Sequence, residues 1–354
     1  MYNIDPLTLT ISGFSAGGFM AVQLALAFSR NFSLGFGVFF AGGPYDCARH
    51  QDFSLACMHN STPEIQSSRV YVQAGGRDGV VGVGVTGQLV RQLEEVLGSG
   101  EEEERKRKGL RFVMLEDAGH VFPTDMDFDD DHGEQSFVRC DESVQPFIAD
   151  CQYDGAGEML KWLYENETFA LMPKRRSSKS GDELSGVLRR YSQMEELGAM
   201  GLAEFGYRYM PESCIGGGSS RASCRLHIAL HGCMMSYLDI GEMWVRHAGY
   251  LEWADTNDLV VLFPQAGHDE TQRPIWYQNG TEYPGAAIGC FDWVGWSGID
   301  ADWKSGAQMR AIMNVVKKLL QDDEVDGTSC CRQVLVKGIF EVEHVIDIHV
   351  LNRL

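Results

Sequence analysis

The chain has 354 residues, 44% of them hydrophobic, which is enough to bury a large core in one α/β domain or in two smaller ones. Its formal net charge of −20 argues against nucleic acid or an anionic membrane as a partner, because their phosphate groups would be repelled. No apolar run reaches the roughly 18 residues that cross a bilayer. We therefore expect a soluble protein, and neutral polymers and small molecules stay open as partners.

Residues 7–20 contain a short apolar and β-branched run that ends in the pattern G-x-S-x-G at residues 13–17 and continues into a predicted helix. A serine at such a turn is held clear of its neighbours, and Cβ atoms at Gly13 and Gly17 would collide with the backbone. The alternative is an ordinary glycine-rich turn. Apolar residues at helical spacing after the turn favour the first interpretation: Met20, Leu24 and Phe28. We predict Ser15 as a nucleophile.

Two later predicted strands end next to an aspartate and a histidine that can form a catalytic triad with Ser15. After a buried strand at 34–43, a strand at 68–76 runs into Asp78, and a strand at 110–115 is followed by His120 in a glycine-containing loop. The carboxyl ends of parallel strands meet at one edge of a sheet, so these side chains are expected near Ser15. The alternatives are that Asp78 only forms an Asp-Gly turn and that His120 is purely structural. The order Ser, Asp, His along the chain favours catalysis.

The segments between these strands carry no chemistry that we can assign. We predict helices at 86–97 and 154–164, a solvated charged insertion at 98–109, and an exposed connection at 174–185. The acidic loop 125–134 has carboxylates that can bind calcium, but its spacing is not that of an EF-hand, so a solvated loop is favoured.

The second half supplies strands at 207–210, 225–232 and 258–264, with a helix at 244–254. The strand at 225–232 ends in His-Gly, and many α/β-hydrolases place a backbone N–H of the oxyanion hole after such a strand. We therefore predict that the amides of Cys233 and Ala16 form that hole. Only fourteen residues precede Ser15, although an α/β-hydrolase needs several strands before its nucleophile strand. This order indicates a circular permutation.

The ten cysteines indicate disulfides and an oxidising compartment. Their spacing suggests three local bridges: Cys47 with Cys57, Cys140 with Cys151, and Cys214 with Cys224. A zinc site is disfavoured because no C-x-x-C pair has a matching second pair. Four N-x-S/T sequons fit glycosylation on a secretory route: Asn31, Asn60, Asn166 and Asn279. Met1 is followed by Tyr-Asn-Ile-Asp-Pro without a charged and apolar leader, so a signal peptide is either missing from this sequence or absent.

A series of motifs in one order resembles the polyhydroxybutyrate depolymerase family of esterases, in particular its permuted, single-domain, secreted enzymes. The resemblance extends from about residue 2 to about residue 320 and rests on YNIDP, SGFSAGGFMAVQL, GGRDGVV, AGHVFPTD, CQYDGAGEMLKWLY, LHIALHGC, VRHAGYLEWADTNDLVVLFPQA, GCFDWVGWSG and KSGAQM.

This resemblance implies a circularly permuted α/β-hydrolase fold with a mostly parallel central sheet and helices on both faces. It implies the triad Ser15, Asp78 and His120, the two oxyanion amides, secretion and no cofactor. We expect a single catalytic domain over residues 1–322, acting as a monomer.

One motif departs from the family, whose aromatic segment commonly reads Cys-Trp-Asp-Trp-Trp-Gly-Tyr, whereas residues 290–296 read Cys-Phe-Asp-Trp-Val-Gly-Trp. The resemblance suggests that these rings line the ester-binding cleft: Phe291, Trp293 and Trp296. It also pairs Cys233 with Cys290. The tail 323–354 matches nothing recognisable, and its Cys330 and Cys331 stay unassigned.

Three functions compete at this stage. The first is hydrolysis of poly(3-hydroxybutyrate) or its oligomers through an acyl-enzyme. The second is a carbohydrate esterase that removes feruloyl or acetyl groups with the same nucleophile elbow, the G-x-S-x-G turn that carries Ser15. The third is a secreted binding protein whose tryptophans contact a polymer face, although aromatic side chains belong more often to the core.

Overall fold

The structure is a computed structural model that describes residues 3–40, 42–45, 68–97, 101, 104, 109–125, 138–165, 171–172, 184–193, 201–215, 223–271 and 285–321. Several predictions lie outside these residues: the Cys47–Cys57 bridge, most of the charged insertion 98–109, most of the acidic loop 125–134, most of the connection 174–185, and the tail 323–354 with Cys330 and Cys331. The domain boundary at residue 322 therefore stays a prediction.

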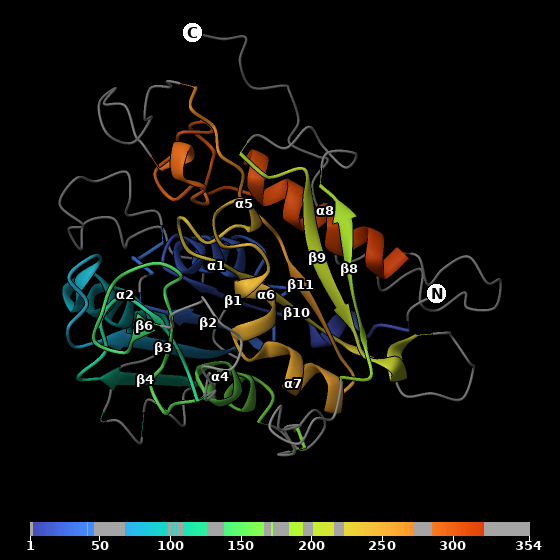
Figure 1. Ribbon diagram of the computed structural model, residues 1–354, viewed down its shortest axis with the longest axis horizontal. Helices are drawn as coiled ribbons and strands as arrows, with labels where there is room; N and C mark the ends of the chain where they lie inside the picture. Colours follow the sequence, from blue (N-terminus) through green and yellow to red (C-terminus); the bar gives the residue numbers. More distant parts are fainter. Residues whose placement is uncertain are drawn as a thin grey trace, which may run out of the picture.

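An eight-stranded sheet crosses the centre of the molecule in the order β4-β3-β2-β1-β10-β11-β9-β8 (Figure 1). Neighbouring strands from β4 to β11 pair in parallel, whereas β9 and β8 are antiparallel. The strands are β1 (Thr10–Phe14), β2 (Gly35–Phe39), β3 (Arg69–Gly75), β4 (Leu110–Leu115), β8 (Val187–Ser192), β9 (Phe205–Met210), β10 (Arg225–Leu230) and β11 (Leu259–Phe263). The sheet is mostly parallel, as the sequence predicts.

The first strand of the chain lies at the centre of this sheet. In β1, Ile11 pairs with Phe36 of β2 on one side and with Ile228 of β10 on the other. The strand that leads to Ser15 thus has neighbours from both halves of the chain. This connectivity is the permuted order that the position of Ser15 indicates.

Helices cover both faces of the sheet. On one face lie α1 (Ala16–Ala27), α2 (Gly82–Leu97) and α8 (Ala307–Gln321), which share one hydrophobic cluster with inward-facing residues of the central strands. On the other face lie α4 (Gly155–Leu163), α6 (Met243–His247) and α7 (Tyr250–Thr256), which form a second, aromatic-rich cluster. Shorter elements complete the fold: α5 (Tyr237–Ile240), β5 (Phe122–Thr124), β6 (Val138–Arg139), β7 (Ile148–Asp150), and the 3₁₀ turns Pro6–Thr8, Glu212–Cys214 and Ala286–Ile288.

Two helix predictions need correction. The helix after Ser15 ends at Ala27, and all its residues except that last one are buried, so it has no single apolar stripe. A helix that is apolar all round is typical of the interior of a large protein. The predicted helix 244–254 is two helices, α6 and α7, because Gly249 between them adopts a left-handed conformation at φ 81°.

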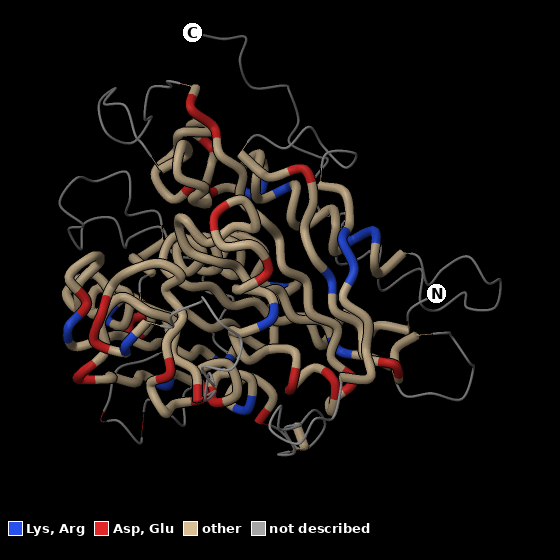
Figure 2. The backbone as a smooth tube through the Cα atoms, viewed as in Figure 1, with Lys and Arg blue, Asp and Glu red and all other residues tan. Residues whose placement is uncertain are grey.

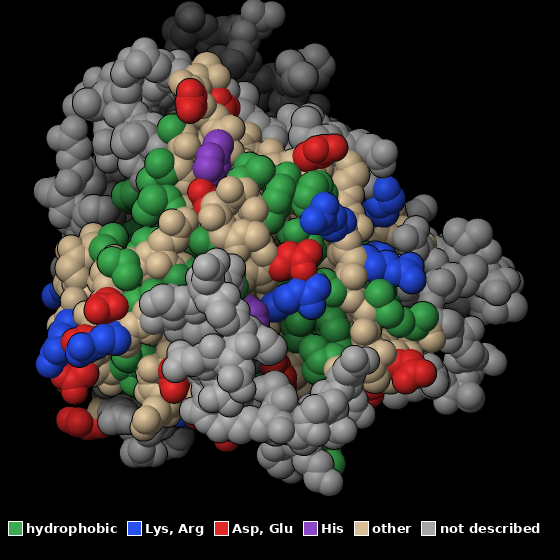
Figure 3. Space-filling model, viewed as in Figure 1, with side chains coloured by type: hydrophobic (Ala, Val, Ile, Leu, Met, Phe, Trp, Pro, Cys, Tyr) green, Lys and Arg blue, Asp and Glu red, His purple; other side chains and the backbone are tan. Residues whose placement is uncertain are grey.

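Charged side chains lie mainly on the outer elements and loops (Figure 2). No residue of β1, β2 or β11 is charged, as expected for strands covered on both faces. Basic and acidic side chains lie side by side on the face drawn in Figure 3. One ion pair between a basic and an acidic side chain joins Arg246 and Glu242 at 2.6 Å.

Among the residues that the structure describes, three disulfides join cysteines in the pairs that the sequence and the resemblance suggest. Two close short loops, Cys140–Cys151 and Cys214–Cys224, and the third, Cys233–Cys290, links segments 57 residues apart. No described helix combines the length and the apolar character that a membrane span requires.

The buried contact between β1 and β10 predicts a stability effect. Ile228 is fully buried in the cluster that packs against α1, so we expect Ile228→Ala to lower the free energy of unfolding by about 2–5 kcal/mol. Urea denaturation measures it, with Leu7→Ala as the control, because Leu7 is 49% exposed and should change stability by less than about 0.5 kcal/mol. Equal effects of the two substitutions would contradict this packing.

Candidate active site

Ser15 stands at a strained turn between β1 and α1. Its backbone has φ 54° and ψ −125°, which is uncommon for a residue with a side chain. A Cβ on Gly13 would overlap the carbonyl of Gly17, and a Cβ on Gly17 would overlap the carbonyls of Leu230 and His231. Both glycines are therefore required for the turn, as the pattern predicts. The second overlap also shows how closely α1 approaches the end of β10.

The three predicted triad residues meet at the carboxyl edge of the sheet. His120 Nε2 lies 2.9 Å from Ser15 Oγ, and His120 Nδ1 lies 2.8 Å from Asp78 Oδ2. The side chains of His120 and Asp78 are only 5% and 4% exposed. Ser15, Asp78 and His120 follow β1, β3 and β4, so the parallel strands bring them together.

The surroundings of Asp78 keep its carboxylate ionised. Burial alone would raise the pKa of Asp78, but the hydrogen bond and electrostatic attraction of His120 together with the amides of Val81 and Val80 outweigh burial and lower the pKa below its ordinary value. Asp78 Oδ1 accepts from Val80 N–H at 2.9 Å and from Val81 N–H at 3.1 Å. An ionised carboxylate can only accept, so His120 carries its proton on Nδ1 and presents Nε2 as the acceptor toward Ser15.

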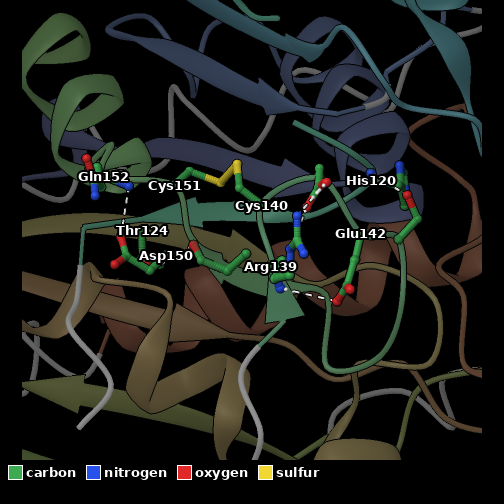
Figure 4. The surroundings of a disulfide bond; sticks show 11 residues. His120, Thr124, Arg139, Cys140, Glu142, Asp150, Cys151 and Gln152 are labelled. Carbon is green, nitrogen blue, oxygen red and sulfur yellow. Dashed lines mark hydrogen bonds and ion pairs between the residues drawn. A yellow bond between two sulfur atoms is a disulfide. The ribbon is translucent and has the colours of Figure 1, made fainter. Parts of the chain in front are cut away.

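The loop closed by the predicted Cys140–Cys151 bridge holds the backbone of His120, and sequence reasoning missed this contact. The His120 N–H donates to Ser143 Oγ at 2.8 Å, and the Gly119 N–H donates to the carbonyl of Cys140 at 2.7 Å. Figure 4 shows the Cys140–Cys151 disulfide in the same region as His120. Ser143 carries no sequence signal, because its partner lies 23 residues away and neither residue belongs to a motif with the other.

Both predicted oxyanion donors belong to segments that adjoin Ser15. Ala16 is the first residue of α1, so helix geometry gives its amide no acceptor within the helix. A Cβ on Gly232 would lie 3.0 Å from Ser15 Cβ, which puts the Gly232–Cys233 peptide beside the serine. Both residues thus lie next to Ser15, and their role as oxyanion donors stays a prediction.

The aromatic segment is placed differently from the prediction for two of its three rings. Phe291 is fully buried and Trp296 is 2% exposed, so both belong to the interior rather than to an open cleft. Trp293 is half-buried and packs on Phe19 of α1 with ring centroids 4.7 Å apart. Of the three rings, only that of Trp293 keeps exposed surface.

A buried carboxylate that sequence reasoning also missed organises this segment. Asp292 is fully buried and accepts hydrogen bonds from the amides of Val294, Gly295, Trp296 and Ser297, and from Ser297 Oγ. Burial raises the pKa of Asp292 despite these donors. The side chain closes a compact turn and therefore fixes where the neighbouring tryptophans lie.

No three His, Cys, Asp or Glu side chains among the described residues gather closely enough to hold a metal ion.

The comparisons with known proteins agree with this geometry. The polyhydroxybutyrate depolymerase of Talaromyces funiculosus is 37% identical over 340 residues, which cover 90% of this chain and 91% of that protein. The chain belongs to the polyhydroxybutyrate depolymerase family. A poly(3-hydroxybutyrate) depolymerase of Delftia acidovorans is 30% identical over 344 residues, but the chain spans only 60% of that relative's length. No family model matches the chain.

Solved structures of the family have the same fold. The PHB depolymerase of Penicillium funiculosum superposes with a TM-score of 0.76, and a PHB depolymerase variant complexed with an R3HB trimer superposes with a TM-score of 0.78. Each is 37% identical and covers 90% of this chain and 98% of its own. The predictions of the polyhydroxybutyrate depolymerase family, of a permuted α/β-hydrolase fold and of an ester hydrolase are confirmed.

The lowered pKa of Asp78 predicts a pH effect on stability. Its carboxylate stabilises the folded state above the ordinary carboxyl pKa of about 4, and this contribution is lost as the pH falls through the lower pKa of the folded protein. We expect wild type to lose its stability advantage over Asp78→Asn between about pH 5 and about pH 3. Urea denaturation of both proteins at each pH measures the advantage, and an advantage independent of pH would contradict the ionised pair.

Proposed function

We propose that this protein is a serine esterase in which Ser15 attacks an ester carbonyl, His120 acts as general base and acid, and Asp78 orients the imidazole. The observation that carries the proposal is the unbroken line of hydrogen bonds from Ser15 Oγ through both nitrogens of His120 to Asp78. Membership in a family of ester hydrolases supports it independently.

The proposed reaction has two steps. His120 Nε2 takes the hydroxyl proton as Ser15 Oγ attacks, and Asp78 stabilises the imidazolium that forms. The imidazolium then gives that proton to the leaving alcohol, and an acyl-enzyme remains. Water, activated by the same imidazole, hydrolyses the acyl-enzyme. The amides of Ala16 and Cys233 hold the oxyanion in each step, and one such donor typically contributes about 3 kcal/mol.

Poly(3-hydroxybutyrate) and its oligomers are the substrates that we propose. Two curated relatives carry the name of that polymer, and a solved neighbour is complexed with an R3HB trimer. No comparison favours a carbohydrate esterase. A binding protein without catalysis is disfavoured because the serine, the imidazole and the carboxylate are already aligned within hydrogen-bonding distance.

We also propose secretion and action as a monomer. The three disulfides are of the kind that persists in an oxidising compartment. Every group assigned to the reaction comes from one chain, so a second copy is not needed to complete the site. The tryptophan that we propose at the cleft is Trp293 alone, because it has surface left beside Phe19.

Release of 3-hydroxybutyrate from the polymer and from short oligomers tests the proposal. Ser15→Ala should abolish release, a loss of at least about a thousandfold, because no other group supplies the nucleophile. The variant should keep the thermal unfolding midpoint of wild type. Release by Ser15→Ala at the rate of wild type would overturn the assignment, and faster turnover of feruloyl esters than of oligomers would favour the carbohydrate esterase.

A further inference from the structure

The imidazole of His231 is held in one tautomer by two backbone groups. His231 Nδ1 lies 2.6 Å from the carbonyl oxygen of Gly232, and His231 Nε2 lies 3.0 Å from the amide nitrogen of Ala266. A carbonyl can only accept and an amide N–H can only donate. The ring therefore carries its proton on Nδ1, donates to Gly232, and accepts from Ala266.

The carbonyl that His231 holds belongs to the same peptide unit as the amide of Cys233. A trans peptide is planar, so its C=O and its N–H point in opposite directions. When the Gly232 oxygen is drawn toward His231, the Cys233 N–H is turned to the other side of the peptide. We infer that His231 is a positioning residue for the oxyanion hole: it sets the direction of the Cys233 amide without touching the substrate.

This inference rests on the proposed function, which makes the Cys233 amide an oxyanion donor. Three further contacts show that the orientation of this peptide is controlled. Cys233 is bonded to Cys290, and the Met234 N–H donates to the carbonyl of Ile288 at 2.9 Å, so the chain is fixed just beyond the peptide. Before it, the main chain of His231 lies directly against Gly17 of the elbow helix.

The buried ring of Phe291 packs against His231. Its ring packs on the imidazole of His231 with centroids 5.0 Å apart, next to the disulfide at Cys290. Phe291 thus supports the proposed site indirectly, because its ring fixes the plane of the His231 imidazole.

The hydrogen bond from the Ala266 amide requires a neutral His231 imidazole. A proton on Nε2 would point at the Ala266 N–H, and neither group could accept. Burial lowers the pKa of His231 to about 4, more than the Gly232 carbonyl and the charge of Asp239 raise it, and His268 lowers it further. The donor to Gly232 is therefore constant through the neutral range.

Two substitutions separate the two contacts of His231. In His231→Asn the side-chain NH₂ occupies the place of Nδ1 and can donate to Gly232, but nothing reaches Ala266. In His231→Gln the amide oxygen reaches the place of Nε2 and can accept from Ala266, but no donor remains beside Gly232. We expect His231→Gln to lower kcat for a p-nitrophenyl ester about 10- to 100-fold with little change in KM, because the lost orientation acts in the transition state.

His231→Asn should keep kcat within about fivefold of wild type. If both variants lose activity equally, or if His231→Gln keeps its kcat, the positioning role is wrong. Failure of this inference is distinguishable from failure of the proposed function, because the serine-esterase mechanism would fail if wild type did not hydrolyse the ester or if Ser15→Ala did.

A measurement on wild type covers the case in which neither variant folds. In ¹⁵N NMR of histidine-labelled protein at neutral pH, the His231 ring should show a protonated Nδ1 and an unprotonated Nε2. The opposite tautomer, or a doubly protonated ring, would overturn the inference.

Discussion

The close approach of α1, the helix that follows Ser15, to the end of β10 is the contact on which the active site depends. Gly17 lies against the carbonyls of Leu230 and His231, with no room for a Cβ. This contact brings the serine of the first strand and the peptide after the tenth strand to one point, although more than two hundred residues separate them. In this permuted fold the proposed nucleophile and the proposed second oxyanion donor come from opposite halves of the chain, so their spacing is set by packing.

A buried polar network under the elbow reinforces the same junction. Thr10 and Ser12 of β1 bond to the two ring nitrogens of His227 in β10 at 2.7 and 2.8 Å. Tyr164 and Tyr250 complete the network by bonding to Thr10 and Ser12 at 2.8 Å each. Burial lowers the pKa of His227 to about 3, so the ring stays neutral and costs no buried charge. A fully satisfied network of this kind keeps β1 and β10 in a single register.

The triad was predictable from the sequence because each member follows directly on a strand, and the ends of parallel strands share one edge. The cysteine pairs were predictable from short spacing or from resemblance. Sequence reasoning did not predict the roles of Ser143 and Asp292 or the tautomer of His231. Each depends on hydrogen bonds to backbone groups, which residue spacing does not reveal. Their positions depend on how loops close, which local propensity does not determine.

Burial was the other quantity that the sequence left open. Periodicity could not show that α1 is enclosed on nearly every side, or that Phe291 and Trp296 face the interior, because an apolar residue reads alike in a core and in a cleft. The short strands β5, β6 and β7 escaped prediction for a related reason: two or three residues are too few to show alternation.

The central claim is that Ser15 is the activated nucleophile of this junction, and covalent labelling tests it most directly. After treatment with a serine-directed organophosphonate, mass spectrometry should find a single adduct on the peptide that contains Ser15, with esterase activity lost in proportion to the label. An adduct on a different serine, or full activity in protein labelled at Ser15, would contradict the account.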